Sequence, residues 1–486
     1  MHPSTVDRDS RLSFWRRVRE FAVPLPMIEL ATARRTLGDW AGACAAARVD
    51  IDLRPRSVAR TYGRELADRL RADLRHLAPD LLRWHLPRVA PDGLLRPGLT
   101  ISLARYPGTD AGTPHLVART APAWADAGQR ISLALWDPAR PAEPAGPHPH
   151  PRPDRRFRLD LHRHLWDVRQ AGELRVRSGA ERQPGAGRLD TGRPEQPASR
   201  RQAVSSSQWP VPDGFDCAVQ RWAAEAELLL DADGSSGHTA TVRLGSRHRL
   251  LLDLVPDPGG GPVGLRIRAA PVRDHPSGLP VLPDAATWIL PDLALLRAGL
   301  IGADGLHPLV ASALVPDRPV AETRPDPTDG PGPRYVECRG VRHRIGVLDG
   351  TLVALDHDPA EIRREELLAA LTGTPLPCLL AIDGAHRQPE NLGDIRARLD
   401  HGDTDGAVAT VERLLGPDAL LRGGALWDEL ETAALRRVSH GLYRAGLGAS
   451  APHPASGLDG YRRELSRRVA RPSGTSRAHP RHASAR

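Results

Sequence analysis

Residues 341–361 read VRHRIGVLDGTLVALDHDPAE, and this stretch decides the fold of the C-terminal part of the chain. Asp349-Gly350 separates two runs that are rich in β-branched and apolar residues. This is the pattern of a two-residue hairpin turn, in which both central residues need a positive φ. Asp358 is placed to cap a helix, and Pro359 suits the first turn of that helix. We therefore expect a β-hairpin that is followed directly by a helix over residues 360–371.

The segment after this helix predicts a further strand and more helices. Gly373 should end the helix, and residues 377–382 (PCLLAI) form a short continuous apolar run. Such a run is typical of a strand that is buried on both faces of a sheet. Helical periodicity returns at 392–399, 406–415 and 426–447. Residues 335–448 are therefore expected to form a mixed α/β domain with a β-hairpin.

Residues 1–136 predict a helical region followed by a small antiparallel sheet. A helix pair is expected over 27–37 and 39–48, around Gly38. One apolar stripe from Val58 to Leu77, at spacings of three and four, predicts a single further helix. Three short runs that are separated by Gly, Pro and Asp predict strands. They cover 99–104, 115–119 and 130–136.

The remaining regions alternate between linkers and a second structured part. Residues 137–208 are rich in Pro, Arg, Gly and Ser, which predicts a mostly disordered linker with a short ordered island near 157–167. Residues 209–316 predict a β-rich domain with short helices, residues 317–334 a second linker, and residues 449–486 a disordered Arg-rich tail. The expected strands and helices of the β-rich domain cover 239–244, 249–255, 263–269, 293–300 and 307–314. The whole chain is thus expected to be an α+β multidomain protein.

The net charge of +8 suggests binding to nucleic acid. The charge is concentrated in two segments. Residues 461–486 contain eight Arg and one Glu, and residues 151–201 contain thirteen Arg and seven acidic residues, so the remainder of the chain is mildly acidic. An Arg-rich tail can bind phosphate backbones without reading sequence, or it can be a solvated terminus. The candidate backbone contacts are Arg462, Arg463, Arg467, Arg468 and Arg471.

Cysteine spacing and hydropathy favour a cytoplasmic protein. Four cysteines are far apart and form no C-x-x-C pair, which argues against a zinc ribbon and a disulfide scaffold and for buried free thiols. They are Cys44, Cys217, Cys338 and Cys378. Arg16, Arg17 and Arg19 interrupt any signal-peptide core, and no apolar run approaches the ~20 residues of a membrane span.

Acidic and imidazole side chains follow the two expected strands of the C-terminal domain. Asp356 and Asp358 come after the hairpin, and Asp383 and His386 come after the apolar run. If these strands were parallel neighbours, the four side chains would meet at one sheet edge and could hold a divalent metal. Asp356, Asp383 and His386 are the catalytic candidates there. The alternative is local chemistry, because Asp358 suits a helix cap and Asp383-Gly384 suits a turn.

A weaker metal candidate is the pair His162 and His164. In an extended strand both would lie on one face, and imidazole is a common metal ligand. His148 and His150, in the Pro-rich segment, are the nearby candidates for a second ligand cluster. A surface strand or a docking motif explains the same pattern without a metal.

No coherent active site emerges, so the leading hypothesis is a non-catalytic multidomain adaptor that binds protein partners. The linker suits a tether or a segment that folds on binding. One alternative is a nucleic-acid-associated protein that uses its Arg-rich linker and tail. The other is a metal-dependent hydrolase-like enzyme with its site at Asp356, Asp358, Asp383 and His386. Apart from that divalent metal, no cofactor is predicted.

Overall fold

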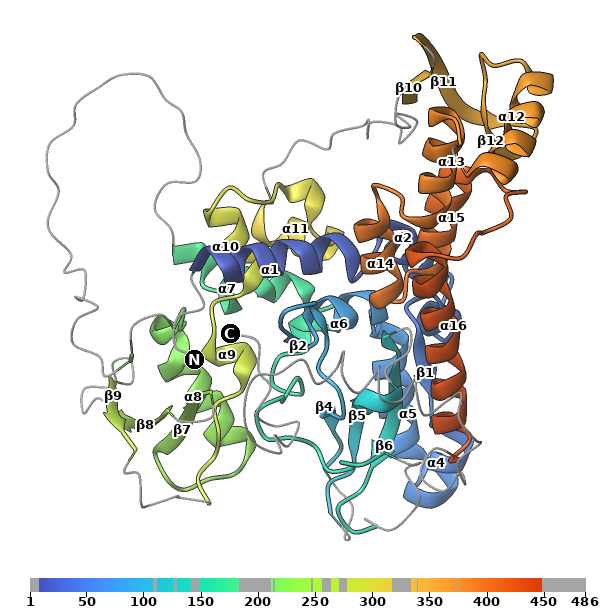
Figure 1. Cartoon of the computed structure of the whole chain (residues 1–486). Coiled ribbons are helices and arrows are strands. Elements are labelled where there is room, and N and C mark those ends of the chain that lie inside the picture. Colours follow the sequence, from blue (N-terminus) through green and yellow to red (C-terminus); the bar gives the residue numbers. More distant parts are fainter. Residues whose placement is uncertain are drawn as a thin grey trace, which may run out of the picture. The chain divides into compact units, whose positions relative to one another are not determined.

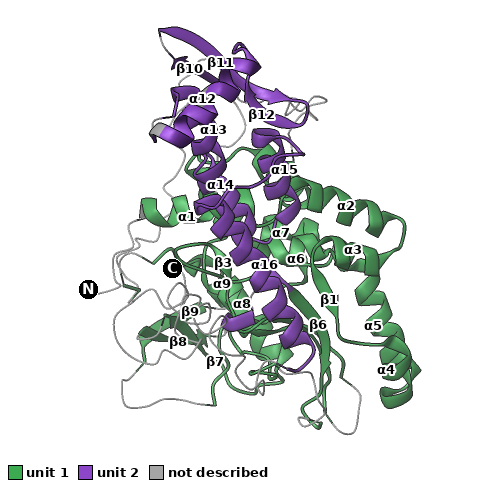
Figure 2. Ribbon diagram, turned by 45° about the vertical axis from the view of Figure 1, so that its right-hand side comes forward, with its two compact units in different colours: residues 1–122, 131–316, 467–486 green, residues 123–130, 317–466 purple. Residues whose placement is uncertain are grey.

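The computed structural model describes residues 8–107, 112–125, 129–140, 148–182, 211–212, 215–245, 248–255, 264–270, 278–316, 334–338, 340–373 and 375–447. These residues form two compact units (Figures 1 and 2). Unit 1 contains the described residues of 8–122 and 131–316, and unit 2 contains those of 123–130 and 334–447. Helices accompany small, mainly antiparallel sheets in both units, which confirms the expected mixed α+β multidomain class.

Six helices open unit 1. They are α1 Arg8–Phe21, α2 Leu25–Thr36, α3 Trp40–Ala46, α4 Pro55–Tyr62, α5 Arg64–His76 and α6 Pro79–His85. α2 and α3 are the expected helix pair, and Asp39 caps α3 by accepting a hydrogen bond from the Gly42 amide at 2.8 Å. The single helix expected over 58–77 is wrong. Gly63 adopts a φ of 88° and separates α4 from α5, although the apolar stripe is buried on both helices.

A four-stranded sheet in the order β1-β6-β5-β4 follows these helices. Its strands are β1 Val49–Ile51, β4 Thr100–Arg105, β5 His115–Thr120 and β6 Ile131–Trp136, and β2 Arg88–Val89 pairs separately with β3 Leu94–Leu95. The last three strands of the larger sheet lie where expected and pair antiparallel. β1 adds a parallel edge, with Val49 opposite Ile131. Three residues are too few for the alternating pattern that would have predicted it.

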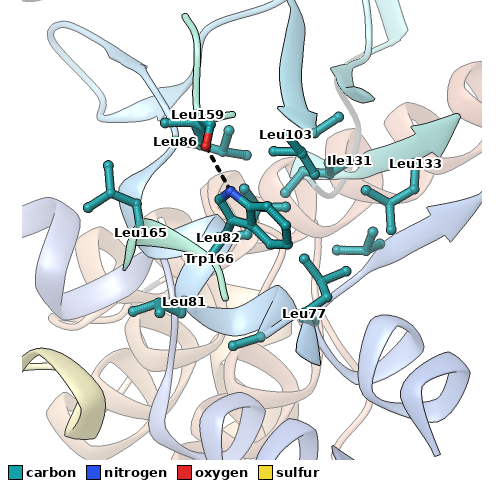
Figure 3. Close-up of a cluster of buried hydrophobic side chains, with 14 of the residues drawn as sticks. Leu77, Leu81, Leu82, Leu86, Leu103, Ile131, Leu133, Leu159, Leu165 and Trp166 are labelled. Carbon is teal, nitrogen blue, oxygen red and sulfur yellow. Dashed lines mark hydrogen bonds between the residues drawn. The ribbon is translucent and has the colours of Figure 1, made fainter. Parts of the chain in front are cut away.

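Residues 148–182 pack into unit 1, which differs from the linker expected over 137–208. The short island expected near 157–167 is ordered, but it does not form the extended strand considered for it. Residues 148–182 contain turns, the 3₁₀ turns Arg163–Leu165 and Ala171–Glu173, and helix α7 Leu174–Arg177. Trp166 is fully buried, and its Nε1 donates to the Leu159 carbonyl oxygen at 3.0 Å (Figure 3). Around it lie apolar side chains from α6, β4 and β6, among them Leu82, Leu103 and Leu133. A few large apolar side chains thus order a segment of otherwise polar composition.

The second part of unit 1 is a three-stranded antiparallel sheet covered by a helix. The elements are α8 Trp222–Ala232, β7 Thr239–Leu244, β8 His248–Val255 and β9 Gly264–Ala269. The strands agree with those expected within one residue, and they pair in the order β7-β8-β9. Three short helices complete the unit: α9 Asp284–Thr287, α10 Pro291–Arg297 and α11 Pro308–Leu314.

The described residues of unit 2 form a three-stranded sheet and the helices α12 to α16. They are β10 Arg334–Cys338, β11 Val341–Leu348, β12 Thr351–Ala354, α12 Pro359–Thr372, α13 Pro377–Arg387, α14 Leu392–Asp400, α15 Thr404–Leu415 and α16 Ala425–Arg444. The hairpin turn is confirmed, with Asp349 at φ 49° and Gly350 at φ 73°. Asp358 caps α12, and Gly373 ends it in the left-handed conformation, as expected. The last three helices lie close to their expected ranges.

The buried strand expected over 377–382 is wrong, because these residues form the first half of α13. Pro377 occupies the first turn of that helix. The buried positions Cys378, Ile382 and Ala385 recur at spacings of four and three, which is helical periodicity. A six-residue apolar run could not distinguish the two structures.

Among the residues that the structure describes, no helix has the length and apolar character that crossing a membrane requires.

Candidate functional site

Three side chains that are distant in the sequence converge in unit 2. Cys338 is the last residue of β10, His357 lies between β12 and α12, and Cys378 is the second residue of α13. Two sulfur atoms and one ring nitrogen from these residues all lie within 4.8 Å of one another. Both cysteines are 1% exposed, and the side chain of His357 is 5% exposed. Two thiols and an imidazole are a donor set that suits a soft divalent metal.

Local structure fixes the position of each of the three residues. The β10–β11 turn through Gly340, at φ 78°, places the first cysteine at the end of its strand. The Asp358 cap fixes the backbone directly after the histidine, and Pro377 starts the helix that carries the second cysteine. The cluster therefore joins a hairpin and two helix N-terminal ends.

A second histidine supports the imidazole of His357. The rings of His343 and His357 are stacked with their centroids 4.2 Å apart, and His343 Nδ1 lies 3.1 Å from the Asp356 carbonyl oxygen. The Nδ1 atom of His357 is buried and has no hydrogen-bond partner among the described residues. Glu361 Oε2 lies 3.6 Å away from it. Such an atom is unusual, because leaving a buried polar group unsatisfied costs about 1–3 kcal/mol.

The surroundings of the Cys378 thiol disfavour its ionised form. Burial raises the pKa of Cys378 to about 11, and the adjacent Cys338 thiol contributes to that rise. Both are free cysteines, as are Cys44 and Cys217. Cys338 and Cys378 belong to the small core cluster that includes the sheet residues Ile345 and Ala354. The alternative to a metal site is that both cysteines serve as small apolar side chains of that core.

Asp356 and Asp358, the expected site residues after the hairpin, each bind a different local partner. Asp356 forms an ion pair with Arg344, whose Nη2 lies 2.9 Å from Oδ1, and hydrogen bonding to Arg344 lowers the pKa of Asp356. Asp358 accepts a hydrogen bond from the Ala360 amide at 2.9 Å, which is the capping role. Both carboxylates are thus accounted for by local structure.

Asp383 and His386 lie on α13 instead of following a strand. Asp383 pairs with Arg387 at 2.8 Å and Arg422 at 2.9 Å, and these hydrogen bonds lower its pKa. His386 is buried, and burial lowers its pKa. Within the part of the chain that is described, neither residue belongs to a group of three donors that could hold a metal ion. Asp356 and Asp358 follow a strand, but Asp383 and His386 lie within a helix. The four residues therefore do not meet at one sheet edge.

His162 and His164 are buried instead of lying on the face of an exposed strand. His162 Nε2 lies 3.1 Å from Glu225 Oε2, and Arg177 donates to both oxygens of the same carboxylate. Burial lowers the pKa of His164 far below its usual range. His148 Nε2 lies 3.0 Å from the Thr120 carbonyl oxygen. These imidazoles are core polar groups, and among the described residues they belong to no group of three donors close enough together to hold a metal ion.

Five of the described Arg residues in 151–201 form ion pairs within unit 1. Their partners are acidic side chains of the same unit: Arg156 with Asp284, Arg158 with Asp160 and Asp233, Arg163 with Asp73 and Asp167, Arg169 with Asp167, and Arg177 with Glu225. A paired guanidinium is a poor phosphate ligand. The candidate backbone contacts Arg462, Arg463, Arg467, Arg468 and Arg471 lie outside the described residues.

Unit 1 contains a cavity of about 200 Å³ with aromatic and basic walls. Trp15, Trp84, Phe157 and Trp288 supply much of its apolar lining. Arg88 also lines it and is 4% exposed. Its two terminal nitrogens donate to backbone carbonyls, its Nε has no partner, and no described carboxylate pairs with it. Burial, with a smaller effect of a neighbouring arginine, lowers its pKa to about 9, so the group is still a cation at neutral pH.

Unit 2 carries most of the large apolar side chains that the structure describes as exposed. Three of them lie together on the second half of α12: Leu367, Leu368 and Leu371 are 65%, 50% and 85% exposed. Ile362, near the start of the helix, packs against the core of the sheet. Most of the large apolar side chains of this helix therefore face solvent.

Sequence reasoning missed the Cys/His cluster, because its members are 19 and 21 residues apart and match no ligand spacing. The one available signal was that two of the four cysteines flank the hairpin-and-helix segment with a histidine between them. No family model matches this chain in a comparison with known families, and no curated protein or solved structure matches it either.

Proposed function

We propose that this chain is a non-catalytic interaction protein that binds a partner protein through the leucine face of α12. The observation that carries the proposal is the exposure of Leu367, Leu368 and Leu371 on one side of a helix. Apolar side chains clustered on a surface are a common mark of a protein-binding site. A helix that lays such a face into an apolar groove is a recurrent mode of recognition.

Burial of this face would contribute to binding. Full burial of a fully exposed leucine contributes about 1.5–3 kcal/mol, and these three are 65%, 50% and 85% exposed, so together they supply roughly 3–6 kcal/mol before the cost of association. Arg363, Arg364 and Glu366 lie on the same helix and are exposed. Charges at the rim of an apolar face set orientation and on-rate more than affinity.

The test compares partner recovery by matched variants. The chain with Leu367→Gln, Leu368→Gln and Leu371→Gln keeps good helix formers at all three positions. Leu37→Gln and Leu420→Gln are the controls, because these leucines are also highly exposed but do not lie on α12. Each tagged protein is recovered from a lysate of the source organism, with and without nuclease, and the associated proteins are quantified by mass spectrometry.

The proposal expects a stoichiometric partner that resists nuclease, is lost from the triple variant and is retained by both controls. Identical partners on all the variants would contradict it. Recovery that disappears with nuclease would instead favour the alternative in which the Arg-rich tail binds nucleic acid.

The cavity of unit 1 favours a second function, the binding of a small aromatic anion. The buried cation of Arg88 has no carboxylate partner, so an anion in the cavity would compensate its charge. Benzoate should then raise the melting temperature of the protein, and uncharged benzyl alcohol should not. Arg88→Met should abolish the effect of benzoate while leaving the free protein at least as stable. Equal shifts by the two compounds would remove this second function.

A further inference from the structure

We propose that Cys338, His357 and Cys378 form a zinc site that joins the β-sheet of unit 2 to α12 and α13. All the residues of this cluster are described, and they come from β10, from the connection between β12 and α12, and from α13. The proposal concerns a site on this chain and is independent of any partner.

The distances in the cluster are close to those of a zinc complex. A tetrahedral ion with Zn–S bonds of about 2.3 Å and a Zn–N bond of about 2.0 Å holds two sulfur ligands about 3.8 Å apart. It holds a sulfur and a nitrogen ligand about 3.5 Å apart. The three donor atoms lie within 4.8 Å of one another, so side-chain movements of about 1 Å would complete the geometry.

The surroundings of His357 are better explained if its imidazole binds a metal than if it is an ordinary core side chain. His357 has a buried ring nitrogen without a hydrogen-bond partner, which an apolar core would not favour. The stacked ring of His343 limits the rotation of that imidazole. Positioning of a metal-binding histidine by its neighbours is a common feature of metal sites.

The donor set identifies the class of metal. Thiolate and imidazole ligands together are typical of tetrahedral zinc sites, whereas magnesium and calcium require oxygen donors. The fourth position is open to a water molecule or to the Glu361 carboxylate, which lies next to His357. Both thiols lose their protons when the metal binds, and those protons go to solvent.

A metal would also explain how so small a core is held together. The cluster of buried side chains beneath the sheet comprises Cys338, Ile345, Ala354, Leu376, Cys378 and Ile382. Two of these six residues are the proposed ligands. Small units that bury little apolar surface are commonly stabilised by a structural metal or by disulfides.

Metal loading of the full chain tests the proposal directly. The protein is purified under reducing conditions without a histidine tag, stripped with a chelator and titrated with Co²⁺. We expect thiolate-to-cobalt charge-transfer absorption that saturates at about one metal per chain. Cys338→Ser and Cys378→Ser should each abolish this absorption, and Cys217→Ser should retain it.

A second measurement needs no variant and therefore holds even if the serine variants fail to fold. Both thiols are buried, so alkylation is measured in a urea concentration that partly opens unit 2, where zinc should slow the alkylation of Cys338 and Cys378 and leave that of Cys217 unchanged. Absence of charge-transfer absorption, its persistence in both serine variants, or alkylation rates that zinc does not change under these conditions would overturn the site. So would a disulfide between Cys338 and Cys378 in the reduced preparation.

Discussion

Replacing Asp292 with Asn should remove a large share of the stability of unit 1. Arg19 donates from Nε and Nη2 to the two oxygens of Asp292, both at 2.8 Å, and Trp84 Nε1 donates to the same carboxylate at 3.0 Å. The side chains of Arg19 and Asp292 are 2% and 0% exposed. This network joins α1, α6 and α10.

The expected magnitude follows from burial. An amide at position 292 would leave the Arg19 cation buried without a counter-charge, which costs about 3–5 kcal/mol. For a unit of this size, that loss lowers the melting temperature by about 10 °C. Removal of both charges in Arg19→Met with Asp292→Leu should recover most of the loss, because the buried pair is replaced by apolar groups.

Thermal and urea unfolding of the variants, followed by circular dichroism, measure these differences. Asp253→Asn is the matched control, because Asp253 pairs with the exposed Arg268 and its replacement should change stability little. The reasoning would be refuted if Asp292→Asn melted within about 2 °C of the wild type, or if the double replacement were no more stable than the single one.

Three further predictions concern pH, backbone conformation and packing. Burial lowers the pKa values of His85 and His148 from 6.5 to about 4, so stability should be full above pH 6.5 and should fall, by about 3 kcal/mol for each ring, as the pH drops to 4. Urea midpoints between pH 4 and 7 measure this loss, which His148→Gln should reduce. Gly416→Ala should lower the free energy of unfolding of unit 2 by about 3 kcal/mol or more, because φ is 93° and the new Cβ would clash with the backbone of the β11–β12 turn. Gly373→Ala is the control for thermal unfolding, since Gly373 has open space around it and the change should cost about 1 kcal/mol. Trp166→Ala should cost unit 1 about 3–5 kcal/mol in urea unfolding, and an unchanged midpoint would show that residues 148–182 contribute nothing to the core.

Local chemistry explains which parts of the fold could be predicted from the sequence. The Asp349-Gly350 turn and the Asp358 cap were predictable because a few adjacent residues determine each of them. The helical nature of 377–382 was not, because a short apolar run is equally compatible with either structure until its neighbours are known. Residues 148–182 were misjudged for a different reason. Their average composition is polar and Pro-rich, but a single buried Trp166 and its neighbours order the segment.

The candidate site was less predictable than the fold, because it depends on contacts between distant elements. Every expected site carboxylate has a local partner in the structure, such as the arginines beside Asp383. The cysteines that do converge were set aside because no short motif links them. Only the folding of the hairpin onto α13 brings Cys338 and Cys378 together.

The proposed zinc site and the proposed binding face lie at opposite ends of α12. The first half of α12 is held by the Asp358 cap, by Ile362 and by the adjacent His357, whereas the leucines of the second half extend into solvent. A zinc ion at His357 would fix the start of the helix to the sheet and to α13. Since a rigid helix loses less conformational entropy on binding than a mobile one, the metal would strengthen partner binding without touching the partner. The leucine face would still exist without zinc, so loss of metal should weaken the interaction and substitution of the leucines should abolish it.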